Sequence, residues 1–160
     1  MHCRDYSNLL NARLYFLCLI FILPVFPVTA EAELAEATGE LHITISNIET
    51  ARGTLQVAVY NKGDDWLDSK AGNPPFISAT KIVSSTDNAT VVIENMPAGN
   101  YAISIFHDLN ENKKLDTNFI GFPKEPFGFS APMSRFGPPK YKDASISVKQ
   151  GVNPIEIALN

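Results

Sequence analysis

The sequence of 160 residues contains only two cysteines, and neither is expected to remain in the mature protein. Cys3 and Cys18 both lie in an N-terminal segment with the pattern of a cleaved signal peptide, described below. A chain without cysteine forms no disulfide and no thiolate-ligated metal site. The stability of the mature protein must therefore come from its hydrophobic core.

An excess of positive charge is also absent. The chain has 13 Lys and Arg against 17 Asp and Glu, a formal net charge of −4 at pH 7. Loss of Arg4, Asp5 and Arg13 with the signal peptide takes away a net charge of +1, so the mature chain carries −5. Domains that bind nucleic acid usually present a basic patch. The composition therefore predicts no nucleic-acid partner.

Long apolar runs are missing except near the N-terminus. Residues 14–28 form an apolar stretch that follows two arginines and ends just before Ala30, which is the layout of a signal peptide. The stretch is shorter than the roughly 18 or more apolar residues of a membrane-spanning helix. We expect residues 1–30 to be a cleaved signal peptide, with cleavage after Ala32 or an uncleaved anchor as alternatives. The mature chain is then periplasmic or secreted and has no membrane span.

Helical periodicity is scarce, and alternation of apolar and polar residues takes its place. Leu41, Ile43 and Ile45 alternate with polar residues, which puts the apolar side chains on one face of a strand. Similar short runs occur at residues 55–59, 89–93, 101–106, 145–148 and 155–159. Only residues 64–70 have some helical character. After a flexible leader over residues 31–39, we expect residues 40–160 to form one all-β domain, a single antiparallel β-sandwich of about seven strands.

Residues 95–100, Asn-Met-Pro-Ala-Gly-Asn, separate two of the predicted strands. Proline and glycine at these positions are typical of a tight turn. We therefore predict a β-hairpin over residues 91–106.

Residues 119–141 break the strand pattern, because aromatic residues alternate there with five prolines. Long connections of this kind are often functional. We predict a binding surface formed by Phe119, Phe122, Glu125, Phe127, Phe129, Phe136 and Tyr141. The alternative is that the rings pack against the end of the sandwich, and Trp66 has the same two possibilities.

The segment that follows the strand at residues 101–106 carries oxygen-bearing side chains at every second position. Asp108, Asn110 and Asn112, the carbonyl of Lys114, and Asp116 reproduce the spacing of the early ligands in a calcium-binding loop. Calcium is accordingly the one cofactor that the sequence suggests. With two carboxylates, such a site would bind with a dissociation constant of roughly 10⁻⁴ to 10⁻³ M.

Two features of a typical calcium loop are missing from this segment. Lys113 occupies the position of the usual glycine, and Phe119 that of the usual bidentate glutamate. The alternative is that Asp108, Asn110 and Asn112 fold the chain through Asx-turns without an ion.

A catalytic reading of the sequence has little support. The chain has no Gly-x-Ser-x-Gly motif for a nucleophilic serine and no His-x-x-x-His pair for zinc. The enzymatic alternative is a hydrolase that uses Asp108, Glu125 and His107. It requires a concave pocket in which these three side chains converge.

Four segments together resemble a known family. They are residues 53–61 (Gly-Thr-Leu-Gln-Val-Ala-Val-Tyr-Asn), residues 96–102 (Met-Pro-Ala-Gly-Asn-Tyr-Ala), residues 107–110 (His-Asp-Leu-Asn) and residues 121–130 (Gly-Phe-Pro-Lys-Glu-Pro-Phe-Gly-Phe-Ser). The chain resembles the bacterial secreted family called domain of unknown function 2141 over about residues 41–159. The Pro-Ala-Gly-x-Tyr segment is also similar, more loosely, to transthyretin-like and carboxypeptidase-regulatory-like sandwiches, which are related in shape to Ig-like domains. The closer resemblance implies an exported β-sandwich and supplies no catalytic residue.

The leading hypothesis from the sequence is an exported, monomeric, non-enzymatic β-sandwich. It would bind a protein, a peptide or a glycan at the surface of residues 119–141. The alternatives are the hydrolase above and a structural component of the cell envelope that associates through its strand edges.

Overall fold

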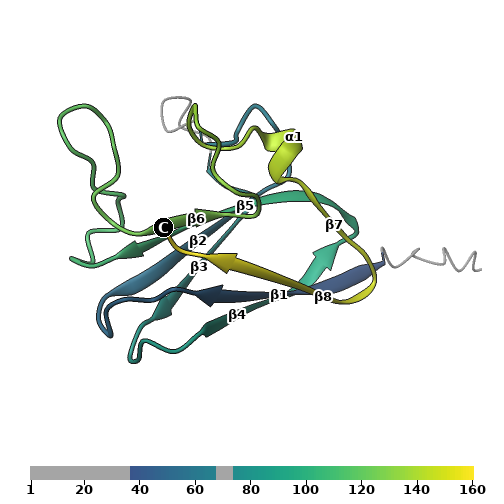
Figure 1. The fold of residues 1–160 in the computed structure, drawn as a ribbon. Coiled ribbons are helices and arrows are strands. Elements are labelled where there is room, and N and C mark those ends of the chain that lie inside the picture. The colour runs from purple at the N-terminus through teal and green to yellow at the C-terminus, as the bar shows by residue number, and fades with distance from the viewer. Residues whose placement is uncertain (1–36, 68–73) are drawn as a thin grey trace, which may run out of the picture. The chain divides into compact units, whose positions relative to one another are not determined.

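The computed structural model describes residues 37–67 and 74–160 (Figure 1). These residues contain eight strands and one short helix. In chain order they are β1 (Thr38–Ser46), β2 (Thr54–Tyr60), β3 (Ile77–Ile82), β4 (Ala89–Pro97), β5 (Gly99–Asp108), β6 (Phe127–Phe129), α1 (Tyr141–Ala144), β7 (Ile146–Val148) and β8 (Gly151–Ala158). The predicted signal peptide, most of the predicted leader and part of the segment at residues 64–70 lie outside the described residues.

The strands form two sheets that lie one above the other (Figure 1). One sheet has the order β4-β1-β8, and the other has the order β3-β2-β5-β6 with β7 added to β5. The predicted all-β sandwich is therefore confirmed. One ladder differs from the antiparallel prediction, since β1 and β8 run parallel, with Ile43 opposite Ile155. Alternation along a strand defines its buried face but not the direction of its neighbour.

The core lies between the sheets and is built from the alternating residues of the long strands. Leu41, Ile43 and Ile45 of β1 and Ile103 of β5 have no exposed surface, and Ile105 has almost none. Burial of a side chain of this size stabilises the fold by about 1.5–3 kcal/mol. The described residues contain no cysteine, so this core holds the two sheets together without a covalent link.

The predicted hairpin over residues 91–106 is wrong. Strand β4 pairs with β1, and β5 pairs with β2, so the chain changes sheet at Ala98. The hydroxyl of Tyr101 donates to the carbonyl of Pro97 (2.9 Å), and Ala98 N–H donates to the carbonyl of Ala37 (3.1 Å). Turn residues are the same whether the chain returns to its own sheet or crosses to the other. Here Ile93 and Ile103 both belong to the buried core, and the crossing puts them on facing sheets.

The chain also crosses between sheets after β1, at Arg52 and Gly53. Gly53 has φ +75°, and a Cβ atom there would clash with the carbonyl oxygen of Asp108. Only glycine adopts this backbone conformation readily at so close an approach. The crossing therefore packs directly against the C-terminal end of β5.

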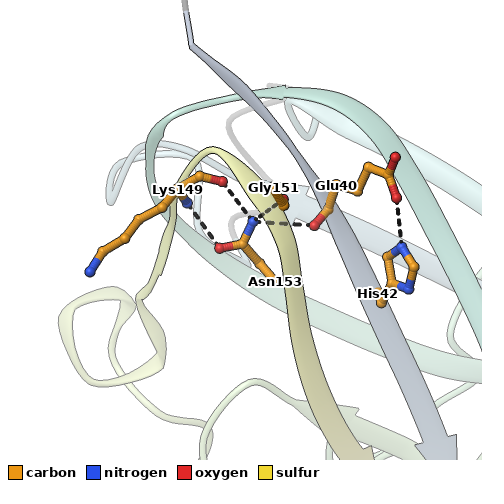
Figure 2. Close-up of polar contacts among 5 residues, drawn as sticks. All are labelled: Glu40, His42, Lys149, Gly151 and Asn153. Atoms are coloured by element: carbon orange, nitrogen blue, oxygen red, sulfur yellow. Dashed lines mark hydrogen bonds and ion pairs between the residues drawn. The ribbon is translucent and has the colours of Figure 1, made fainter.

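At the opposite end of the sandwich, Asn153 holds the β7–β8 turn against β1 (Figure 2). Its Nδ2 donates to the carbonyls of Lys149 (2.7 Å), Gly151 (2.8 Å) and Glu40 (3.2 Å), and its Oδ1 accepts from Lys149 N–H (2.9 Å). A Cβ atom on Gly39 would clash with the Lys149 carbonyl. The absence of a side chain at Gly39 thus lets the turn approach the start of β1.

Two long connections rise from the sheet that contains β5 and β6 (Figure 1). We call residues 109–126 the β5–β6 loop and residues 130–140 the β6–α1 loop.

Of the helices in the described residues, none is long and apolar enough to cross a membrane.

Asn153 gives a direct test of this part of the fold. We expect Asn153→Ala to lower the free energy of unfolding by about 1–2 kcal/mol, because the hydrogen bonds of its side chain to the turn and to β1 are lost together. Denaturant unfolding followed by circular dichroism measures the change. Asn88→Ala, in the exposed β3–β4 connection, is the matched control and should be neutral. An Asn153→Ala variant as stable as the control would contradict the role assigned to Asn153.

Candidate functional site

A cleft of about 710 Å³ lies between the two loops and over the outer face of β5 and β6. Ser104 and Phe106 of β5 alternate with core residues, so they face outward into the cleft. The walls come from both loops and are mostly apolar. They include Leu115, Phe122, Pro123, Met133 and Pro138. We call this feature the apolar cleft.

Several apolar side chains around the cleft are in contact with solvent. Phe122 is 58% exposed, and Leu115 and Met133 are also partly exposed. Contiguous exposed apolar surface is uncommon on soluble monomers and usually marks an interaction site. The apolar cleft is therefore the best candidate for a ligand site in the described residues.

The structure separates the predicted binding-surface residues into three groups. Phe119 and Phe136 are fully exposed beyond the cleft, whereas Phe122, Phe127 and Phe129 line it. Phe127 is nonetheless almost completely buried, because it lies in β6 beside the core. It contributes only a small part of its ring to the surface.

Glu125 differs from the exposed surface residue that the sequence predicted, because only 6% of its surface is exposed and it borders a neighbouring hollow instead of the apolar cleft. Its Oε1 accepts from Leu109 N–H (2.9 Å), and its Oε2 accepts from Asp116 N–H (3.0 Å). A buried carboxylate needs such donors to offset the loss of hydration. Glu125 therefore ties the start and the middle of the β5–β6 loop together.

Tyr141 and Phe129 pack instead against Trp66, which the sequence alone did not connect with them. Ring centroids lie 5.3 Å apart for Trp66 and Tyr60, 5.9 Å for Trp66 and Phe129, and 6.4 Å for Trp66 and Tyr141. The indole N–H of Trp66 donates to the carbonyl of Pro139 (2.8 Å). These rings pack against one another, although Phe129 also lines the apolar cleft, and the cluster holds the β6–α1 loop against the sheet.

The Tyr60 hydroxyl of this cluster has a perturbed acidity. Burial raises the pKa of the Tyr60 hydroxyl above its ordinary value, and a hydrogen bond with the Ser104 side chain offsets part of this effect. Tyr60 therefore stays neutral at physiological pH. Its hydroxyl adds no charge beside the floor of the apolar cleft.

Asp108 organises the first half of the β5–β6 loop. It is completely buried, and its two carboxylate oxygens accept from Asn112 N–H (3.1 Å) and Lys113 N–H (2.7 Å). Asn112 N–H is shared with Asn110 Oδ1 (3.2 Å), and Lys114 N–H donates to Asn112 Oδ1 (2.7 Å). The bonds of Asn110 and Asn112 to N–H groups two residues on are Asx-turns, as in the alternative that the sequence offered, whereas Asp108 bonds N–H groups four and five residues on. Lys113 has φ +61°, which explains why glycine is usual at this position.

Asp116 completes the loop by accepting from two side-chain amides. Asn110 Nδ2 donates to Oδ2 (2.7 Å), and Asn112 Nδ2 donates to Oδ1 (3.2 Å). In the described part of the chain, no three His, Cys, Asp or Glu side chains gather in a group that could hold a metal ion. The five predicted calcium ligands do lie in one hydrogen-bonded loop, and the calcium site and the ion-free loop both remain open as alternatives.

His107 lies at the base of this loop and is also completely buried. Its Nε2 carries a hydrogen, because it bonds the carbonyl oxygen of Arg52 at 2.7 Å and that oxygen can only accept. Its Nδ1 is buried and has no hydrogen-bond partner among the described residues. None of His107, Asp108 and Glu125 lines the apolar cleft. The convergent pocket required by the hydrolase alternative is not found in the described residues.

The role of Glu125 is tested by Glu125→Gln, which replaces one of its two acceptor oxygens by a donor. We expect the free energy of unfolding to fall by about 1–3 kcal/mol, because one buried N–H loses its acceptor. Glu111→Gln, an exposed glutamate of the same loop, should leave stability unchanged. Thermal or denaturant unfolding of both variants measures the difference. Equal stability of the two variants would show that Glu125 does not hold the loop.

Calcium binding is tested by thermal melting of the protein in millimolar calcium and in chelator. A cation bound only by the native state raises stability by about 1.4 kcal/mol at ten times its dissociation constant, which shifts the midpoint by several degrees. We expect the midpoint to be unchanged, because the carboxylates of Asp108 and Asp116 already accept hydrogen bonds. A calcium-dependent rise that Asp116→Asn abolishes would identify a cation site instead.

Comparison with known proteins gives one match. The model of the family described as "Uncharacterized protein conserved in bacteria (DUF2141)" matches residues 43–156, from β1 to β8 and including both loops. This match covers more than half of the chain and confirms the resemblance predicted from the sequence. Comparisons with curated proteins and with solved structures give no match. The looser similarity to transthyretin-like sandwiches stays a prediction.

Proposed function

The chain belongs to the bacterial DUF2141 family, and we propose that it is an exported, non-enzymatic module that binds a peptide segment in the apolar cleft. The observation that carries this proposal is the cleft itself, an open apolar hollow built by two ordered loops on a rigid sheet. Its volume, about 710 Å³, falls within the range of roughly 300–1,000 Å³ that is common for ligand sites.

The lining favours an apolar side chain as the bound group. Polar side chains at the cleft are few, and the Ser104 hydroxyl already bonds Tyr60. A glycan would need several hydrogen-bonding groups beside the aromatic rings, whereas an aromatic or branched aliphatic side chain needs mainly apolar contact. We therefore place a peptide or an exposed protein segment ahead of a glycan.

The proposal is non-enzymatic because the three candidate catalytic side chains are already bound to the backbone and are buried. The carboxylates of Asp108 and Glu125 each accept two backbone N–H groups, and His107 donates to a backbone carbonyl. All three are buried away from the cleft. A general acid or base must reach the proton that it transfers. These contacts support a role of the three residues in holding the loop.

Export is supported by the N-terminal pattern over residues 1–30, with its arginines, apolar stretch and small residue before the expected cleavage point. Outside the cytoplasm the protein would meet unfolded or extended polypeptides without competition from cytosolic chaperones. A peptide site that needs no cofactor suits that setting.

Trp66 allows the proposed site to be tested without a label. It is the single tryptophan of the chain and contacts Phe129, which lines the cleft. We expect peptides selected from a random library on the full-length protein to be rich in aromatic or branched aliphatic residues. Their binding should change the Trp66 fluorescence with a dissociation constant in the range of about 1 µM to 1 mM.

Two double variants show whether the cleft is the site. Leu115→Ser with Met133→Ser removes apolar surface from the cleft and should weaken binding about tenfold, equivalent to about 1.4 kcal/mol. Ile82→Ser with Val152→Ser makes the same kind of change on exposed residues of β3 and β8 and should leave binding unchanged. Peptides that bind the cleft variant as tightly as the unmodified protein would refute the proposal.

A further inference from the structure

We propose that the tips of the two loops dock on a membrane surface that contains anionic phospholipid. The loop tips are Phe119 and Ile120 in the β5–β6 loop and Phe136 in the β6–α1 loop. None of these three side chains lines the apolar cleft, so the docking surface is distinct from the proposed peptide site.

The side chains at the tips are exposed to a degree that is unusual for apolar residues. Phe119 is 99% exposed, Phe136 is 100% exposed and Ile120 is 73% exposed. Such rings gain nothing from the core and are held in contact with water, which is unfavourable. Insertion of these side chains into the apolar layer of a membrane would remove this unfavourable contact with water.

The turn that carries Phe119 and Ile120 is rigidly built. The side-chain oxygen of Asn118 accepts from Ile120 N–H (3.0 Å) and from Phe122 N–H (2.9 Å). Gly121 N–H donates to the carbonyl of Asn118 (2.9 Å), and Asn118 N–H donates to the carbonyl of Phe122 (2.8 Å). These bonds close a tight turn whose own backbone is satisfied. The two apolar side chains are therefore directed outward by the turn.

A similar hydrogen-bonded turn carries Phe136. The hydroxyl of Ser134 accepts from Phe136 N–H (3.1 Å) and donates to the carbonyl of Gly137 (3.0 Å), while Ser134 N–H donates to the same carbonyl (3.1 Å). Both tips are thus ordered before any partner arrives, which lowers the entropic cost of docking. Both loops line the same cleft, so their tips lie on the same side of the domain.

The charge of the loops matches an anionic partner. The two loops, residues 109–126 and 130–140, contain five Lys and Arg and three Asp and Glu, a formal net charge of +2, in a chain whose total is −4. Of the three acidic residues, Glu125 is buried against backbone amides, and the carboxylate of Asp116 accepts two amide donors. In the part of the chain that the structure describes, Lys113, Lys114, Lys124 and Arg135 form no ion pair.

Exposed aromatic residues flanked by Lys and Arg are the combination that docks proteins at the membrane interface. Rings enter the boundary of the acyl chains, and cationic groups stay at the level of the phosphates. An acidic peptide would satisfy the charges but would not receive two separate apolar tips at once. An extended anionic surface with an apolar layer beneath it satisfies both features.

Vesicle flotation with the full-length protein tests the proposal. The vesicles contain phosphatidylcholine alone or phosphatidylcholine with about a quarter phosphatidylglycerol. We expect binding to the anionic vesicles to be at least about fivefold stronger than to the neutral ones. Phe119→Ser with Phe136→Ser should reduce binding to anionic vesicles at least about fivefold, because each tip loses its aromatic ring. The control Ile82→Ser with Val152→Ser should bind as the unmodified protein does.

The outcomes separate the two proposals. Anionic vesicles that bind the tip variant as well as the unmodified protein would overturn the docking surface and assign any binding to another part of the chain. Equal binding to neutral and anionic vesicles would also overturn the docking surface. So would soluble poly-glutamate that competes with the vesicles and binds the protein as tightly as they do. Circular dichroism confirms that the variants fold. The peptide response of Trp66 should persist in the tip variant, whereas the cleft variant should lose that response and keep its binding to vesicles.

Discussion

The burial of one face of each long strand between two sheets is the constraint on which the rest of this structure depends. With no cysteine in the described residues, only side chains such as Leu41, Ile43 and Ile103 hold the sheets together. The chain changes sheet after β1, β3, β4 and β7, and these crossings bring the apolar faces of the two sheets opposite each other. The crossing at Gly53 packs against the end of β5, where the functional loops begin.

The loops are joined to this core by buried polar groups. Asp108 and Glu125 lie at the edge of the sandwich, and each carboxylate accepts two backbone N–H groups of the β5–β6 loop. A long segment without strand partners leaves many backbone groups unpaired, and buried ones must find other acceptors. The two acidic residues supply them. Acidic side chains that resemble catalytic or metal-ligating groups in the sequence thus act as internal supports for the loop.

The second loop is held by aromatic packing rather than by carboxylates. Trp66 contacts Phe129 and Tyr141 and bonds the carbonyl of Pro139, which fixes the β6–α1 loop beside the sheet. Two differently supported loops then leave an apolar cleft between them and carry exposed aromatic tips above it. The same segment has a positive net charge in an acidic chain. Shape, apolar exposure and charge therefore coincide on one side of the domain.

The sequence by itself determined the class of fold and the location of the unusual segment. Alternation over residues 41–45 has a period of two, which only a strand with one buried face satisfies. The prolines among residues 119–141 disfavour a central strand, and Phe119, Phe122 and Phe136 of this segment are exposed. These properties follow from local geometry and are visible in a short window of sequence.

Only the tertiary structure decided which segments meet. Residues such as those at 97–99 occur both in hairpin turns and in crossings between sheets, so their composition does not tell the two apart. The parallel pairing of β1 with β8 joins strands more than a hundred residues apart. The burial of Glu125 depends on amides at Leu109 and Asp116, and the position of Trp66 depends on Pro139. Contacts of this kind are set by packing over the whole domain, so no local pattern encodes them.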